Sequence, residues 1–291
     1  MDYLAFDALA LALPAGLLML RRSRRRFPHA AAAGLILLAL AWTAPWDDYL
    51  VRTGVWSYAP AGVLARVAAV PAEEYLFVVL QVVLVAAWGL HVPARTGPAA
   101  GLRRRGAVGW AAVGLLGLVL LATGGHARYA GLLLAWASAP LALQHAVAGD
   151  VLGRQRARRV AIALPVVVWL CIADRLALAH GIWTISPSSS SGMGLLGLPY
   201  EEAAFFGLTC LLVTDGLLLG TDPLVLARVR LLLRHAVRRA GPAAGDARPA
   251  AARARAVVAL QPNVGTGRPV GQHDRQPSGA VLRPRPVERA P

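Results

Sequence analysis

Long blocks of apolar residues, separated by short polar stretches, fill the chain up to about residue 220. A helix that crosses a membrane needs about 20 predominantly apolar residues, each adding about 1.5 Å of length. Seven segments meet this requirement: 3–20, 29–45, 72–90, 107–123, 128–147, 160–179 and 201–220. The pattern predicts an all-α membrane protein with about seven transmembrane helices.

Composition agrees with this pattern and separates the end of the chain from the rest. Of the 291 residues, 57% are hydrophobic and 15% are charged, which is too apolar for an ordinary soluble domain. From about Thr221 the composition changes to Ala, Arg, Pro and Gly without periodicity. We expect residues 222–291 to form a basic, disordered tail without catalytic residues, whose first amphipathic stretch lies on anionic lipid.

The net charge of +15 comes from arginine, because all 30 basic residues counted are arginines. They cluster at 21–26, 95–105, 154–159 and 228–239, after the first, third, fifth and seventh apolar segments. With seven spans, these clusters share one side of the membrane. The positive-inside rule then predicts an external N-terminus and a cytoplasmic tail in the plasma membrane. Membrane topology explains the positive charge, so no nucleic-acid partner is expected. The arginines follow the first apolar segment instead of preceding it, which argues against a signal peptide.

Cysteine and histidine give no indication of a metal centre. Cys171 and Cys210 both lie within apolar segments, and the sequence has no CxxC and no metal-type Cys/His spacing. We therefore expect neither a disulfide nor a bound metal. The seven histidines are scattered, most of them near predicted helix ends, and are expected to be interfacial or surface residues.

The chain contains an internal duplication. The stretches "DDYLVRTGVWSY" (47–58) and "VPAEEYLF" (70–77) recur as "DRLALAHGIWTI" (174–185) and "LPYEEAAF" (198–205). At an offset of 127, Asp47, Gly54 and Trp56 match Asp174, Gly181 and Trp183; at 128, Pro71, Glu73, Glu74 and Phe77 match Pro199, Glu201, Glu202 and Phe205. Tyr3 and Pro14 likewise match Tyr129 and Pro140. Three spans therefore repeat as three spans, joined by the fourth.

This 3+1+3 arrangement predicts the domain organisation. Residues 1–92 form the first three-helix repeat, 93–126 the linking region with the fourth helix, 127–221 the second repeat, and 222–291 the tail. The linking helix returns the chain to the outer side, so both repeats run in the same direction, related by an axis near the membrane normal. The two Glu-Glu pairs then lie at the outer ends of the third and seventh spans, giving two equivalent carboxylate sites.

The paired glutamates admit a structural explanation and a functional one. Proline followed by acidic residues is an ordinary helix start, because carboxylates complement the positive end of the helix dipole. That explanation accounts for one Pro-x-Glu-Glu motif alone. It does not account for a motif that occurs twice, inside a membrane span where ionisable residues are costly, and each time after an Asp…Gly-x-Trp element. The pattern therefore favours a functional role.

The residues around the glutamates indicate acid–base chemistry on an apolar alkene. Two carboxyls with different proton affinities form a proton donor and a proton acceptor. Helical spacing places Phe77 beside one pair and Phe205 and Phe206 beside the other, and aromatic faces stabilise cations. Trp56 and Trp183 either extend this aromatic wall or belong to an interfacial tryptophan belt. No P-loop or paired DxxxD motif is present, and no GxGxxG follows a predicted strand, so no nucleotide or diphosphate cofactor is indicated.

The motifs "PAEEYLF" and "LPYEEAAFF", each following Asp…Gly-x-Trp, resemble those of the integral-membrane lycopene cyclases. The resemblance covers about residues 1–221 and implies a fused form of two halves that also occur as separate subunits. It implies redox-neutral cyclisation of the ψ-ends of a linear carotenoid within the bilayer, typically to β rings, without a flavin or other cofactor. The implied acid–base residues are Glu73, Glu74, Glu201 and Glu202, with Asp47 and Asp174 in support. Association with other carotenoid-biosynthesis enzymes is also expected, and the arginine-rich tail is not part of the family pattern.

The sequence leaves several alternatives open. A carotenoid hydratase or prenyl transferase, a small proton-coupled transporter, and a non-catalytic scaffold of a carotenoid-making complex each remain consistent with intramembrane glutamates. Within the cyclase hypothesis, the sequence does not decide between β and ε rings, one-ended and two-ended cyclisation, or the preferred linear carotenoid. It also leaves open which glutamate is the acid, whether the two halves share one site, and the oligomeric state.

Overall fold

The structure is a computed structural model that describes residues 2–94, 97 and 102–240. Seven helical stretches are long and apolar enough to cross a membrane: Tyr3–Leu20, His29–Arg52, Ala72–Gly89, Arg103–Thr123, Gly125–Arg154, Arg156–Ala179 and Tyr200–Gly220. These confirm the seven predicted spans. Several run past the predicted bounds, because backbone hydrogen bonding continues beyond the point where charged residues end an apolar block. The predicted disorder of the tail falls mostly on residues 241–291, which lie outside the described residues.

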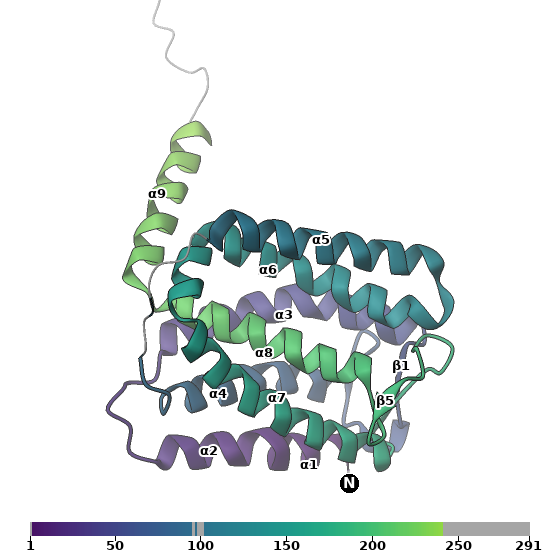
Figure 1. Cartoon of the computed structure of the whole chain (residues 1–291). Coiled ribbons are helices and arrows are strands. Elements are labelled where there is room, and N and C mark those ends of the chain that lie inside the picture. Colours follow the sequence, from purple (N-terminus) through teal and green to yellow (C-terminus); the bar gives the residue numbers. More distant parts are fainter. Residues whose placement is uncertain (1, 95–96, 98–101, 241–291) are drawn as a thin grey trace, which may run out of the picture. The chain divides into compact units, whose positions relative to one another are not determined.

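The elements follow one another in a simple order (Figure 1). The helices are α1 (Tyr3–Asp7), α2 (Leu13–Leu20), α3 (His29–Arg52), α4 (Ala72–Gly89), α5 (Leu102–Thr123), α6 (Arg128–Arg154), α7 (Arg156–Ala179), α8 (Tyr200–Gly220) and α9 (Pro223–Ala240). A π-helical turn, η1 (Ala8–Ala12), joins α1 to α2, and two 3-10 turns are η2 (Pro60–Gly62) and η3 (Gly125–Ala127). The short strands are β1 (Trp56–Tyr58), β2 (Arg66–Val67), β3 (Val70–Pro71), β4 (Trp183–Ile185), β5 (Gly194–Leu195) and β6 (Leu198–Pro199).

Each glutamate helix begins directly after a tight hairpin. Strands β2 and β3 pair antiparallel before α4, and β5 and β6 pair in the same way before α8. The turns contain residues in the left-handed region, with φ of 57° at Ala68, 54° at Leu196 and 81° at Gly197. Proline then fixes the chain direction at the helix start, since Pro71 and Pro199 occupy the N-cap positions. The hairpins thus hold the first turn of α4 and of α8 in equivalent positions.

The ribbon of β1 and β4 shows how the two repeats are related. Its central pair is Ser57 opposite Thr184, which are equivalent residues at an offset of 127, and their hydroxyl oxygens lie 2.7 Å apart. The strands come from equivalent positions in the two repeats, and the antiparallel pairing is centred on the equivalent residues Ser57 and Thr184. A two-fold axis through the Ser57–Thr184 pair therefore relates the two strands. Deeper in the bundle, Gln81 Nε2 of α4 donates to Thr209 Oγ1 of α8 at 2.9 Å, again between equivalent positions. The parallel duplication is therefore confirmed, with its axis between α4 and α8.

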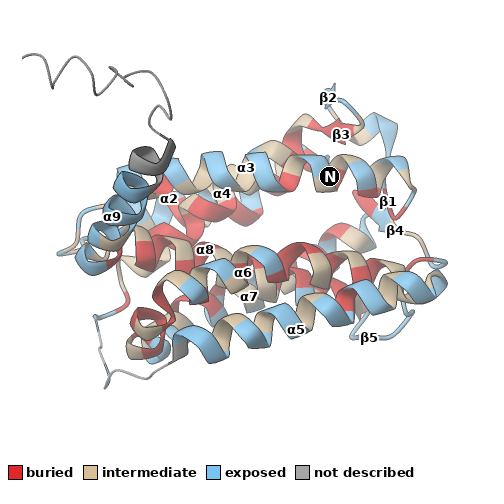
Figure 2. Ribbon diagram, turned by 90° about the horizontal axis from the view of Figure 1, so that it is seen from above, coloured by how far each residue is buried: buried red, intermediate tan, exposed pale blue. Residues whose placement is uncertain are grey.

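The helices of the two repeats pack around this axis, and the linking helix lies outside them. In an 18-residue apolar stretch of each helix, 50% of the residues are buried in α4 and 56% in α8, compared with 6% in α5. Figure 2 shows the same contrast: the buried residues of α4 and α8 face the interior, whereas α5 is mostly exposed. Helix α5 packs along α6, with Gly117 and Gly131 facing each other's backbones, as is common between membrane helices.

Candidate active site

The four predicted glutamates are all buried, in the first turns of α4 and α8. Glu73 and Glu74 are 2% and 7% exposed, and Glu201 and Glu202 are 4% and 3% exposed. They lie at the end of the bundle that carries the short strands (Figure 1). Burial of carboxyl groups away from water is costly unless hydrogen bonds or shared protons compensate, so their partners define what each can do.

The first glutamate of each pair holds the loop that precedes its helix. Glu73 Oε1 accepts a hydrogen bond from the backbone N–H of Leu64 at 2.6 Å. Its equivalent, Glu201, accepts from the backbone N–H of Ser191 at 2.7 Å. In both residues, Oε2 is buried and has no hydrogen-bond partner among the described residues. These two glutamates therefore connect the loop backbone to the start of each helix.

The second glutamate of each pair is held by tyrosine. Glu74 Oε2 accepts from the hydroxyl of Tyr3 at 2.5 Å and from that of Tyr58 at 2.8 Å. Glu202 Oε1 accepts from the hydroxyl of Tyr129 at 2.6 Å. Burial raises the pKa of the Tyr58 hydroxyl well above its ordinary value, so this phenol remains a neutral donor.

The tyrosines were not recognised as site residues from the sequence. Tyr3 and Tyr129 served only as evidence of the duplication. Their equivalent positions at the start of the first helix of each half could have indicated a role in the site. Tyr58 had no such signal, since its equivalent in the second half is Ile185. The structure therefore gives Glu74 two phenol donors and Glu202 one, which makes the two halves chemically different.

The predicted aspartates take up different positions. Asp174 is fully buried; its Oδ1 accepts from Trp183 Nε1 at 2.9 Å, while its Oδ2 has no partner in the described part of the chain. Asp47 is 3% exposed, and its Oδ1 is likewise unpartnered there. A further carboxyl, Asp7, is fully buried with both oxygens unpartnered among the described residues, within electrostatic reach of Glu74. Asp7 was not foreseen because it is not repeated: Leu133 is its equivalent.

Aromatic side chains cross between the halves at this site. Trp183, from the second half, packs against Tyr3 at a ring-centroid distance of 5.1 Å. Trp56, from the first half, packs against Tyr129 at 5.8 Å and against Phe205 at 5.6 Å. Both tryptophans are more than nine-tenths buried, so they do not belong to an interfacial belt. The exchange places an aromatic face from one repeat beside the glutamate–tyrosine pair of the other.

The second glutamates line one central cavity rather than two separate sites. Its lining residues come from both repeats: Tyr3, Trp56, Tyr58, Glu74, Phe77, Asp174, Trp183, Glu202, Phe205 and Phe206. The cavity measures about 20 Å³, which is space for about one water molecule. The expectation of two equivalent sites, one per half, is thus replaced by one shared site, while Glu73, Glu201 and Asp47 lie outside its lining.

A second, larger cavity of about 500 Å³ approaches the same site from the side. It lies between α3, α4, α6 and α8, and its walls are mainly aliphatic and aromatic. Leu38, Trp42 and Leu143 in its walls are 69%, 47% and 65% exposed, so it opens on the flank of the bundle. Glu74, Phe77 and Phe205 line both cavities, and Glu74 is the one of the four glutamates that the large cavity reaches within the described ranges.

The corresponding flank of the other half is bridged by a hydrogen bond. Trp169 of α7 is the equivalent of Trp42 at an offset of 127, and its Nε1 donates to the backbone oxygen of Ala10 at 2.6 Å. Ala10 lies in the π-helical turn η1, a feature that often marks functional sites because it alters the regular hydrogen-bond ladder. Trp42, by contrast, stands exposed at the large cavity. The two flanks of the bundle therefore differ.

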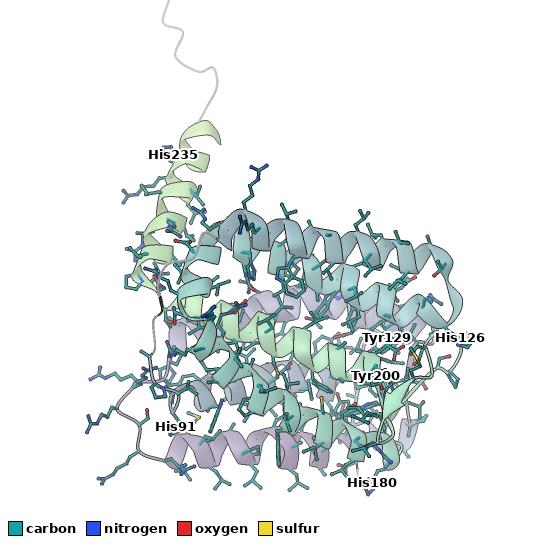
Figure 3. All side chains as sticks on the ribbon, in the orientation of Figure 1. His91, His126, Tyr129, His180, Tyr200 and His235 are labelled. Atoms are coloured by element: carbon teal, nitrogen blue, oxygen red, sulfur yellow. The ribbon has the colours of Figure 1, made fainter. Side chains whose placement is uncertain are left out.

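Histidine and cysteine do not contribute to the lining of the central cavity. Figure 3 shows His91 and His235 at the end opposite Tyr129, and His126 and His180 at the same end as Tyr129. His145 departs from the expected surface position, since it is 8% exposed within α6 and bonded to the Leu141 carbonyl. Both cysteines are free.

Each of the two repeats matches a known protein family. A family model described as lycopene cyclase matches residues 2–90 and 128–216, one segment in each repeat. A lycopene beta-cyclase of Halobacterium salinarum is 42% identical over 227 residues, which covers 75% of this chain and 95% of that protein. A bifunctional lycopene cyclase/phytoene synthase of Podospora anserina is 32% identical over 199 residues, covering 63% of this chain and 34% of that protein.

One solved structure also resembles the fold. The crystal structure of a mycobacterial Insig homolog from Mycobacterium vanbaalenii covers 68% of this chain and 99% of its own, with 18% identity and a TM-score of 0.42. At that level, the likeness adds nothing about function.

Proposed function

Because this chain belongs to the lycopene cyclase family, and so is an enzyme that cyclises lycopene, we propose that it works by acid–base catalysis at the central cavity. The substrate is lycopene or a related linear carotenoid, and the product carries β-type rings. The single observation that carries the proposal is the position of Glu74, where the tyrosine-lined central cavity meets the large apolar cavity.

Glu74 is assigned as the acid. Two phenol donors, Tyr3 and Tyr58, bond to Oε2, which leaves Oε1 for the proton that the substrate receives. Transfer of this proton to the terminal double bond of the ψ-end forms one C–H bond and a tertiary carbocation. The neighbouring double bond then attacks the cation, which forms the ring C–C bond and moves the positive charge into the new six-membered ring.

Glu202 is assigned as the base, with Asp174 beside it in the cavity lining. This carboxylate, from the other repeat than Glu74, removes a proton from the ring, and the electrons of that C–H bond form the ring double bond. One proton enters and one proton leaves, so the reaction is an isomerisation without redox change. After the product has left, the central cavity of about 20 Å³ has space for about one water molecule, which returns the proton from Glu202 to Glu74 before the next substrate enters.

The aromatic residues are assigned to the cation. Phe77, Phe205, Phe206, Trp56 and Trp183 surround the two glutamates, and aromatic faces attract a positive charge. A cavity with so little space for water also limits capture of the carbocation as an alcohol. This point favours a cyclase over a hydratase, which needs an attacking water at the cation.

The large cavity is assigned to the rest of the polyene. Its opening between α3 and α6 faces the flank of the bundle, where a carotenoid dissolved in the bilayer approaches. A cavity of about 500 Å³ accommodates one end of a long linear chain while the remainder stays among the lipid tails. Two-ended cyclisation then requires release and rebinding with the other end inward.

The membrane orientation is also part of the proposal. The described arginine clusters lie at the helix ends opposite the glutamates, so positive-inside places the catalytic end outside and the tail in the cytoplasm of a plasma-membrane protein. Residues 1–92 and 127–221 act as the two catalytic repeats, and 93–126 as their link. Association with other carotenoid-biosynthesis enzymes remains a prediction for the basic tail.

The test is pigment analysis in a lycopene-accumulating host. The wild-type protein is expected to convert lycopene to cyclic carotenoids of unchanged mass. Glu74→Gln and Glu202→Gln are each expected to lower the rate of ring formation at least 100-fold, as is usual when a general acid or base is removed. Unchanged lycopene with membrane-inserted wild type would contradict the function. Full activity of both glutamine variants would contradict the mechanism and leave the function intact.

A further inference from the structure

A crevice lies at the end of the bundle opposite the glutamates. It measures about 180 Å³ and is formed by the loop between α2 and α3, the last turns of α4 and α8, and the first turns of α7. Three arginines line it, Arg25 and Arg26 from the loop and Arg158 from α7. The remaining walls are largely aliphatic and include Val85, Leu90 and Leu217. A basic rim over an apolar floor is the form expected of a site for an anionic amphiphile.

Among the described residues, no acidic side chain forms an ion pair with the arginines of this crevice. The ion pairs found in the described ranges use Arg52, Arg103, Arg159 and Arg228. Two neighbouring arginines of α7 differ: Arg159 binds both oxygens of Asp215 at 2.6 Å, whereas the side chain of Arg158, within the part of the chain that the structure describes, donates only to the neutral Gln155 side chain, at 3.2 Å. Arg25 and Arg158 line the same crevice, and their like charges repel each other. An anion between these two guanidinium groups would relieve that repulsion.

Two buried polar atoms in the crevice also lack partners. Arg158 Nε is buried without a hydrogen-bond acceptor among the described residues. Thr214 is fully buried, and its hydroxyl is unpartnered over the same ranges. Groups of this kind are normally satisfied, because a buried polar atom without a hydrogen-bond partner destabilises the folded protein. A ligand with several acceptor oxygens would satisfy both atoms.

We propose that the crevice binds a lipid-type amphiphile through its phosphate group, with the hydrocarbon chain on the apolar walls. Arginine suits a phosphate because its planar fork donates two parallel hydrogen bonds to neighbouring oxygens. The site is separate from the catalytic cavities and does not depend on the reaction assigned to them. The bound lipid contacts both the loop between α2 and α3, which carries Arg25 and Arg26, and the ends of α4, α7 and α8.

The experiment measures the thermal stability of the purified full chain in a neutral detergent. The probes are dioctanoyl phosphatidic acid, dioctanoylglycerol and inorganic phosphate, which separate the complete amphiphile from its chain and its head group. Phosphatidic acid is expected to raise the Tm by about 5 °C at saturation, as for a ligand about 100-fold above its Kd. Dioctanoylglycerol and inorganic phosphate are expected to have little effect.

Three variants locate the effect. Arg158→Gln and Thr214→Val are expected to lose at least half of the phosphatidic-acid shift. Arg156→Gln is the matched control, since it removes the same charge from an exposed position one half-turn away on α7 and is expected to keep the shift. Because Arg158→Gln also removes a packed side chain, Thr214→Val provides a test that changes neither charge nor size.

The proposal is overturned by any of four results. These are no shift of wild type with phosphatidic acid, an equal shift with inorganic phosphate, an equal shift with dioctanoylglycerol, or equal losses in Arg156→Gln and Arg158→Gln. The last result would mean that phosphatidic acid responds to surface charge in general. Each of these outcomes leaves the cyclase assignment untouched, because the assay does not measure carotenoid turnover.

Discussion

The hydroxyl of Tyr3 donates to Glu74 Oε2 at 2.5 Å, a contact between residues 71 positions apart in the chain. It joins the first transmembrane helix of the repeat to the third, and Tyr129 makes the equivalent contact with Glu202 at 2.6 Å in the second repeat. The hydroxyl fixes which oxygen of Glu74 remains available in the cavity. This duplicated pair is therefore the centre of the proposed acid–base site.

Removal of the phenol hydroxyls is expected to reduce catalysis without unfolding the protein. Tyr3→Phe and Tyr58→Phe each remove one donor to Glu74. Each is expected to lower kcat at least 10-fold, because the lost hydrogen bond would strengthen as Glu74 gives up its proton and becomes charged, and a hydrogen bond to a charged group contributes about 1.5–3 kcal/mol. The double variant should lose less than the product of the two effects, since both act on one oxygen. Tyr49→Phe, at a 45% exposed position, is the control. Unchanged rates in the double variant would remove the tyrosines from the mechanism.

The two glutamates of a pair are expected to respond differently to substitution. Glu73→Gln keeps an oxygen that can accept from the Leu64 N–H, so ring formation should stay within a few-fold of wild type. Glu73→Ala loses that acceptor and is expected to lower stability by about 1–3 kcal/mol, measured as a lower Tm. Glu74→Gln should show the reverse, with normal stability and little activity. Equal loss of activity in Glu73→Gln and Glu74→Gln would contradict this division of roles.

A bulky residue in the large cavity is expected to block the substrate. Ala139 lines the cavity on α6, and Ala139→Trp should lower ring formation by at least 10-fold with little change in Tm. The matched control is Ala112→Trp, at an exposed position on α5 and outside the cavity lining, which should turn over lycopene at the wild-type rate. Normal activity of membrane-inserted Ala139→Trp would show that the polyene approaches by another route.

The two bidentate arginine pairs are expected to differ in their contribution to stability. Asp215 is fully buried beneath Arg159, so Asp215→Ala leaves an unpaired charge inside the bundle and should cost about 3–5 kcal/mol. Asp150 and Arg228 are 26% and 33% exposed, and Arg228→Gln should cost about 1 kcal/mol or less. Thermal or denaturant unfolding in detergent measures both. Similar costs for the two changes would contradict the role assigned to burial.

Much of the architecture could be predicted from residue patterns. Apolar length determines whether a segment can cross a bilayer, because the backbone must satisfy its hydrogen bonds within a helix of about 20 residues. The offsets of 127 and 128 established the duplication, and an odd linking helix makes a duplication parallel. The pattern did not set the helix ends: α3 continues through Pro45 to Arg52, since helical hydrogen bonding does not stop at the first charged residue.

The site could be predicted only in part, and the reason is visible at Tyr58 and Asp7. Both are buried close to Glu74, yet neither is repeated, since Ile185 and Leu133 occupy the equivalent positions in the other half. The internal comparison that revealed the glutamates could not reveal them. The tryptophans show a related limit, because Trp56 and Trp183 belong to the repeat by sequence but pack against the opposite repeat.

The sequence by itself determined the seven spans, the parallel duplication, and the family to which the Pro-x-Glu-Glu motifs belong, because these depend on local composition and on spacing along the chain. Only the tertiary structure decided that Glu74 and Glu202 share one cavity while Glu73 and Glu201 hold the loops. Adjacent residues on a helix point about 100° apart, so which of two neighbouring carboxyls faces the centre depends on how the helices pack around the two-fold axis.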